Sequence, residues 1–85
     1  MKNKQKYNQS FTESFAIDES VLNDLEYNSI PEWDSVGHMG LIATLEDTFD
    51  IMMEMDDIIA FSSYKKGIDI LKKFKIEIEK WIRRV

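Results

Sequence analysis

The spacing of large apolar residues constrains the fold of this chain more than any other feature. These side chains recur every three or four positions in three separate stretches: Tyr7, Phe11 and Phe15; Leu41, Leu45 and Phe49; and Tyr64, Ile68 and Leu71. This period places them on one face of an α-helix. The segment "KIEIE" near the C-terminus alternates as a strand would, but no second strand pairs with it. The sequence therefore predicts an all-α protein.

At 85 residues the chain is expected to form one domain, residues 1–85, around a single core at about 7–75. Helices are predicted from about Tyr7 to Ala16 or Ile17, over 35–49, and as a short third helix over 55–61. A fourth helix begins at Ser62 or Ser63, with Ser63 suited to cap it. Its pattern continues to the C-terminus, so residues 76–85 are predicted to be a helical extension.

A long first loop, residues 18–33, separates the first two predicted helices. Its polar and irregular composition argues against a strand, and loops of this length in small domains often have a function. Four apolar side chains are expected to hold it on the core: Val21, Leu22, Leu25 and Ile30.

Composition excludes several classes of site. The chain has no cysteine and one histidine, which rules out disulfides and the usual zinc ligand sets. No run approaches the ~18 apolar residues that a membrane span requires. The basic N-terminus is not followed by the apolar stretch of a signal peptide. We therefore expect a cytoplasmic protein without a membrane span.

Charge is distributed unevenly along the chain. The interval 7–64 contains 13 of the 16 acidic residues and no lysine or arginine, whereas 65–85 carries eight basic side chains. Such an anionic region attracts basic partners and repels nucleic acid. The charge pattern favours a basic protein partner over a merely solvated surface.

The stretch "IPEWDSVGHMG" begins the second predicted helix with two glycines, although each glycine costs a helix about 1 kcal/mol relative to alanine. A helical wheel places the core residues of this helix on one arc and four other residues on the opposite arc: Val36, Gly40, Ala43 and Asp47. Small outward residues allow another molecule to approach closely. Close packing within the domain is the alternative explanation of the glycines.

Asp34 and Ser35 stand at the tip of this helix. Most such pairs only cap a helix. The exposed N–H groups and partial positive charge of the same position also stabilise a phosphate esterified there. A Ser35–His38 nucleophile is disfavoured, because neither an orienting acid nor an oxyanion loop is visible and His38 falls on the core arc.

The segments "NSIPEWDSVGHMGLIATLEDTFDI" and "DDIIAFSSYKKGIDIL" resemble the acyl carrier proteins, over about Phe11 to Phe74. The resemblance implies a small antiparallel four-helix bundle with a long first loop and a short third helix. It also implies that a separate transferase esterifies Ser35 with 4′-phosphopantetheine from coenzyme A. The thiol then carries an acyl group as a thioester, and the carrier itself is not an enzyme.

The same resemblance implies the partners of a monomeric carrier: a phosphopantetheinyl transferase, an acyl- or aminoacyl-loading ligase, and downstream acyltransferases or synthases. Asp34 and Val36 would flank the cofactor. The expected partner-binding residues are Met39, Gly40, Ala43, Glu46, Asp47, Asp50, Asp56 and Asp57. Fatty-acid carriers have acids where this chain has Gly37 and Gly40, which favours a dedicated biosynthetic pathway.

Three alternatives stay open. The first is a D-alanyl or other aminoacyl carrier, the second an unmodified helical docking module, and the third a small hydrolase that uses Ser35 and His38. Six residues would line a space for cargo or, if that space is closed, form the core: Leu41, Leu45, Phe49, Ile58, Ile59 and Leu71. The basic C-terminal stretch either packs on its own bundle, covers the acidic face, or docks a partner through Trp81.

Overall fold

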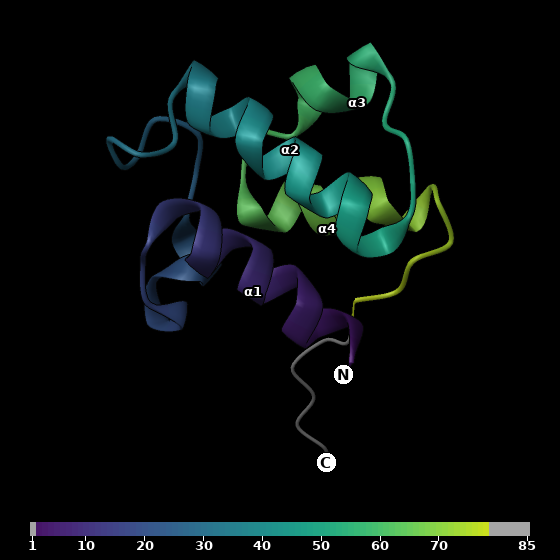
Figure 1. The fold of residues 1–85 in the computed structure, drawn as a ribbon, viewed down its shortest axis with the longest axis horizontal. Coiled ribbons are helices and arrows are strands. Elements are labelled where there is room, and N and C mark those ends of the chain that lie inside the picture. The colour runs from purple at the N-terminus through teal and green to yellow at the C-terminus, as the bar shows by residue number, and fades with distance from the viewer. Residues whose placement is uncertain (1, 79–85) are drawn as a thin grey trace.

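The computed structural model describes residues 2–78, and the helices there confirm the all-α prediction (Figure 1). The segments are α1 (Asn3–Phe15), the 3₁₀ helix η1 (Glu19–Asp24), α2 (Ser35–Phe49), α3 (Met55–Ala60) and α4 (Tyr64–Lys72). An isolated bridge between Glu26 and Ser63 is the sole β-type pairing within this part of the chain. No helix among these residues has the length and apolarity to cross a membrane.

Several helix ends lie where local sequence signals put them. The bounds of α2 agree with the prediction, and α1 ends at Phe15 with Ala16 in the left-handed region. Ser63 caps α4 as predicted, because its side chain accepts a hydrogen bond from the Lys66 N–H. Short polar side chains at these positions satisfy N–H groups that the first helical turn leaves unpaired.

The prediction of a fourth helix that continues to the C-terminus is wrong within the described residues. α4 ends at Lys72, and Lys75 adopts a left-handed conformation with φ 65°. The Ile76 N–H donates to the Leu71 carbonyl at 3.1 Å, and the Lys75 N–H donates to the Lys72 carbonyl at 2.9 Å. This bond pair is a Schellman motif, which closes a helix. Residues 76–78 are non-helical, while 79–85, including Trp81, lie outside the described residues.

An aromatic core joins α1 to the rest of the domain. Tyr7, Phe11 and Phe15 lie on one face of α1 and are fully buried, as their four-residue spacing predicts. Trp33 packs edge-on against Phe11 at 5.6 Å and stacks on Phe15 at 5.4 Å, and Phe61 lies beside it. Figure 1 shows α1 running alongside α2, and these two helices pack on each other.

The long first loop is more ordered than its composition predicts. It contains η1, which Asp18 caps by accepting the Ser20 N–H at 2.9 Å. Leu22 and Leu25 are buried as expected, but Val21 is exposed, so its predicted role as an anchor is wrong.

This loop also holds the beginning of α4. The Tyr27 N–H donates to the Ser62 carbonyl at 2.9 Å, and the Tyr64 N–H donates to the Leu25 carbonyl at 3.0 Å. These bonds fix residues 25–27 beside residues 62–64.

Buried polar groups connect α1, η1 and α4. The Tyr7 hydroxyl donates to the Tyr64 carbonyl at 2.6 Å, and the Tyr64 hydroxyl donates to Asn8, whose amide donates to Glu19 at 3.3 Å. Burial raises the pKa of Tyr7 well above its ordinary value, and burial is also the main cause of the raised pKa of Tyr64. Both phenols therefore remain neutral donors, which satisfies polar groups that would be costly to bury unpaired.

Gly67 of α4 and Gly40 of α2 have opposite surroundings. A Cβ atom at Gly67 would collide with the Phe61 ring and the Tyr7 hydroxyl, whereas a Cβ at Gly40 would meet nothing within 4 Å. Gly67 thus lets the aromatic core reach the backbone of α4.

We predict that Gly67→Ala lowers the free energy of unfolding by about 1–3 kcal/mol, because the added methyl overpacks the core. Gly40→Ala is the matched control and should raise it by up to about 1 kcal/mol, because alanine favours the helix. Urea unfolding at neutral pH measures both. A Gly67→Ala variant as stable as the Gly40→Ala variant would contradict the packing described here.

Candidate functional site

The N-terminus of α2 is held by Asp34 and not by Ser35. Asp34 Oδ1 accepts the Gly37 N–H at 2.8 Å, and the Asp34 carbonyl accepts the His38 N–H at 2.7 Å. Asp34 is therefore the N-cap, with the acceptor geometry that this position requires. The capping explanation for the Asp34–Ser35 pair applies to the aspartate alone.

Ser35, the first residue of α2, has an exposed side chain. Among the described residues its hydroxyl makes no hydrogen bond, since Asp34 already supplies the cap. The Ser35 hydroxyl is therefore accessible to an approaching molecule.

The two glycines near Ser35 have different roles. A Cβ at Gly37 would overlap the backbone carbonyl of Glu32, so Gly37 is required for the preceding loop to fold against α2. The interpretation that both glycines lower the outer surface is therefore wrong for Gly37. Gly40 is exposed with open space beside it, so close approach of another molecule stays a prediction for Gly40 alone.

His38 connects three parts of the fold. The Trp33 Nε1–H donates to His38 Nδ1 at 2.9 Å, and His38 Nε2 lies 2.8 Å from the Ile58 carbonyl of α3. Because an indole nitrogen only donates, Nδ1 must accept and Nε2 must carry the hydrogen that is donated to Ile58. Both ring nitrogens are occupied, so neither is available as a base for Ser35.

An open groove of about 370 Å³ lies beside Ser35. Its lining comes from α2, with Ser35, His38 and Met39, and from α3, with Met55, Ile58 and Ile59. Tyr27, Phe61 and Ser62 complete it. We call this space the Ser35 groove. Most of the lining side chains are apolar, a feature typical of ligand-binding surfaces.

Several apolar side chains on α2, on α3 and in the segment between them are exposed. Val36 is 80% exposed, Ile59 72% and Met55 69%, and Met39 and Met52 are exposed as well. Of these residues, Met39, Met55 and Ile59 line the Ser35 groove. Val36, predicted to flank the cofactor, and Met39, predicted to bind partners, are thus both exposed.

The other predicted partner-binding residues are exposed, with the exception of Glu46 and Asp57. The exposed group consists of Gly40, Ala43, Asp47, Asp50 and Asp56. Glu46 is half-buried, and its carboxylate accepts the Met53 N–H at 2.9 Å, so it also orders the turn after α2.

Asp57 does not belong to the acidic surface, contrary to the sequence interpretation. Its side chain is buried and forms an ion pair with Lys73, just beyond the end of α4. The hydrogen bond from Lys73 lowers the pKa of Asp57 and raises that of Lys73. Asp57 thus ties α3 to the segment that follows α4.

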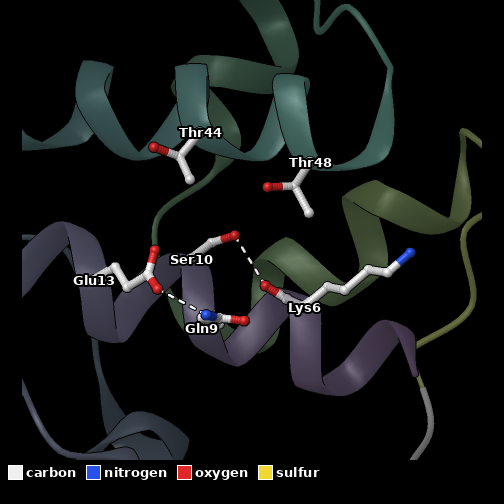
Figure 2. A pocket seen from close by; sticks show the side chains of 6 residues that line it. All are labelled: Lys6, Gln9, Ser10, Glu13, Thr44 and Thr48. Atoms are coloured by element: carbon white, nitrogen blue, oxygen red, sulfur yellow. Dashed lines mark hydrogen bonds between the residues drawn. The ribbon is translucent and has the colours of Figure 1, made fainter. Parts of the chain in front are cut away.

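A second, polar pocket of about 310 Å³ lies between α1 and α2 (Figure 2). Its lining residues are Lys6, Gln9, Ser10, Glu13, Thr44 and Thr48. The Gln9 amide donates to Glu13 at 2.7 Å, and the Ser10 hydroxyl donates to the Lys6 carbonyl at 3.0 Å. The polar side chains of Gln9, Ser10 and Glu13 therefore already have partners within α1, in contrast to the hydroxyl of Ser35.

The sequence interpretation did not identify Trp33 as the support of the site. A relevant signal was present, because Trp33 directly precedes the N-cap and His38 is the fourth helical residue. Contact between these two positions is the hydrophobic staple that fixes how a chain enters a helix. In this chain the two stacked rings also share a hydrogen bond.

Comparison with known proteins gave no match to any protein-family model, curated protein or solved structure.

We predict that Asp34→Ala lowers the free energy of unfolding by about 1 kcal/mol, because it removes the N-cap. Ser35→Ala should change it by less than about 0.5 kcal/mol, since the hydroxyl has no partner. Chemical denaturation measures both variants. Equal losses would show that Ser35 helps hold the helix and is not free.

A second prediction concerns pH. The pKa of Asp57 in the folded protein lies below its ordinary value of 3.8. Its contribution to stability is therefore complete above that value and is lost as the pH falls through the folded-state pKa. Asp57→Asn should thus be less stable than wild type at pH 7 and approach wild type in strong acid. Urea unfolding at the two pH values measures this, with Asp56→Asn as the matched control because Asp56 is the exposed neighbour of Asp57.

Proposed function

We propose that this chain is an acyl carrier protein and that Ser35 is the site of 4′-phosphopantetheine attachment. The observation that carries the proposal is the Ser35 hydroxyl, which is exposed and released from capping by Asp34 at the mouth of an apolar groove. Neither helix stability nor packing accounts for a serine at this position.

The surroundings of Ser35 suit a phosphodiester. The N-terminus of α2 presents a partial positive charge and N–H groups toward an anion at Ser35. When bound, the cofactor supplies a thiol that carries an acyl group as a thioester. The apolar side chains of the Ser35 groove, including Met39 and Ile59, lie beside this attachment point.

Attachment requires an external catalyst. Ser35 Oγ forms a bond to the pantetheine-side phosphorus of coenzyme A, the pyrophosphate P–O bond breaks, and 3′,5′-ADP leaves with the bonding electrons. His38 cannot take the serine proton, because both of its ring nitrogens are occupied, and we assign this role to a base of the transferase. The protein is accordingly proposed to be a substrate of the transferase.

The proposal extends to the fold type and the partners. Three longer helices with a short α3 fit the arrangement of an antiparallel four-helix carrier with a long first loop. Val36, Met39 and the small residues Gly40 and Ala43 would contact partner enzymes. Asp47, Asp50 and Asp56, all exposed, would attract the basic surfaces of a transferase, a loading ligase and an acyltransferase.

The test is the intact mass of the protein after incubation with coenzyme A, Mg²⁺ and a broad-specificity phosphopantetheinyl transferase. Wild type should gain one phosphopantetheinyl group, and Ser35→Ala none. Ser62→Ala is the matched control, because Ser62 also lines the groove and is exposed. This control should gain the same mass as wild type.

Failure of wild type to gain mass with several transferases would overturn the proposal and favour an unmodified docking module. If the mass is gained, loading with a fatty acyl or an aminoacyl group by purified ligases distinguishes the acyl carrier from the aminoacyl carrier.

A further inference from the structure

The Ser35 groove has a floor formed by His38 and Phe61. The His38 ring is half-buried and stacks on Trp33 at 6.1 Å with an interplanar angle of 18°. Phe61 meets it edge-on at 6.2 Å and is almost completely buried. Both rings line the groove on one side and adjoin the buried core on the other.

Hydrogen bonds fix the His38 ring at both ends. On one side it accepts from the indole of Trp33, and on the other it reaches the carbonyl of Ile58. His38 thus spans from α2 to α3 across the bottom of the groove. Displacing the His38 ring would leave the buried Trp33 N–H without an acceptor. This free-energy cost keeps the floor of the groove closed.

Below this floor the domain is filled. Leu41, Leu45 and Leu71, which the sequence offered as walls of a space for cargo, are completely buried members of the core. Ile58 and Ile59 line the groove instead. Close-packed interiors leave few voids larger than a water molecule, so a chain entering this core would have to displace side chains.

We propose that His38 determines the cargo specificity of this carrier by closing the floor of the Ser35 groove. An acyl chain linked through Ser35 lies in the open groove against Met39 and Ile59. The groove covers short apolar acyl groups, and the additional carbons of long chains remain in solvent. This inference rests on the proposed function, because the chain reaches the groove through the modified serine.

The test uses the holo protein carrying butyryl, octanoyl or hexadecanoyl groups, each introduced from the corresponding acyl-coenzyme A by the transferase. The measured quantity is the rate of thioester cleavage by hydroxylamine, followed by intact mass. In wild type, hexadecanoyl and octanoyl thioesters should be cleaved at equal rates, because carbons beyond the groove gain no protection.

His38→Ala removes the bond across the groove to Ile58 and the ring above the core, so an acyl chain can displace the side chains below more easily. Cleavage of the hexadecanoyl thioester should slow by roughly tenfold relative to wild type, since protection follows the fraction of chains that is buried. His38→Gln should restore the wild-type length profile, because its amide oxygen can accept from Trp33 while its amide N–H donates to Ile58.

Met39→Ala is the matched control, because Met39 lines the groove without bonding across it. Met39→Ala should speed thioester cleavage for all three acyl groups alike. Its cleavage rate should not fall as the acyl chain becomes longer. The free energy of unfolding of each variant is measured in parallel. A purely structural role for His38 would speed cleavage at every length together, and that result would overturn the proposal.

Two other results would also contradict the role of His38. The first is a wild-type cleavage rate that keeps falling from octanoyl to hexadecanoyl, and the second is a His38→Ala variant whose cleavage rates depend on chain length as in wild type. Both refute the role of His38 and leave the carrier function intact. Absence of the phosphopantetheinyl mass increment refutes the carrier function itself at the first step, before any chain length is compared.

Discussion

The burial of Trp33 is the interaction on which the rest of the structure depends. Its indole is surrounded by Phe11, Phe15 and Phe61, and its one polar atom donates to His38. Burying a side chain of this size stabilises the fold by roughly 2–3 kcal/mol, provided that the N–H finds a partner. Because Trp33 directly precedes the cap of α2, the same packing fixes where Ser35 stands.

Local signals made much of the fold predictable. The ends of α2 and the cap at Ser63 follow from residues within one helical turn of each end. The end of α4 could not be predicted from the sequence, because Ile78 fits both the spacing of a helix and the alternation of a strand. α1, α2 and α4 are all followed by a left-handed residue other than glycine, at Ala16, Asp50 and Lys75, and only after α4 did a further apolar spacing in the sequence suggest that the helix continued.

The candidate site was predictable only in part. The exposure of Ser35 and Val36 follows from their helical phase, since the apolar arc of α2 fixes which side faces solvent. The roles of Asp57 and Gly37 did not follow, because they depend on Lys73 and on the Glu32 backbone. Such contacts between separate segments arise from the assembled fold, and no spacing rule encodes them.

The shortness of α3 has a consequence for how the groove can change. A helix of six residues has little stability of its own. Two side chains from outside hold it: His38 at the Ile58 carbonyl, and Lys73 at Asp57. The outward side chains of α3, among them Met55 and Ile59, take no part in either attachment. Substitutions at Met55 and Ile59 can therefore alter the outer wall of the groove while both attachments of α3 and the aromatic core remain unchanged.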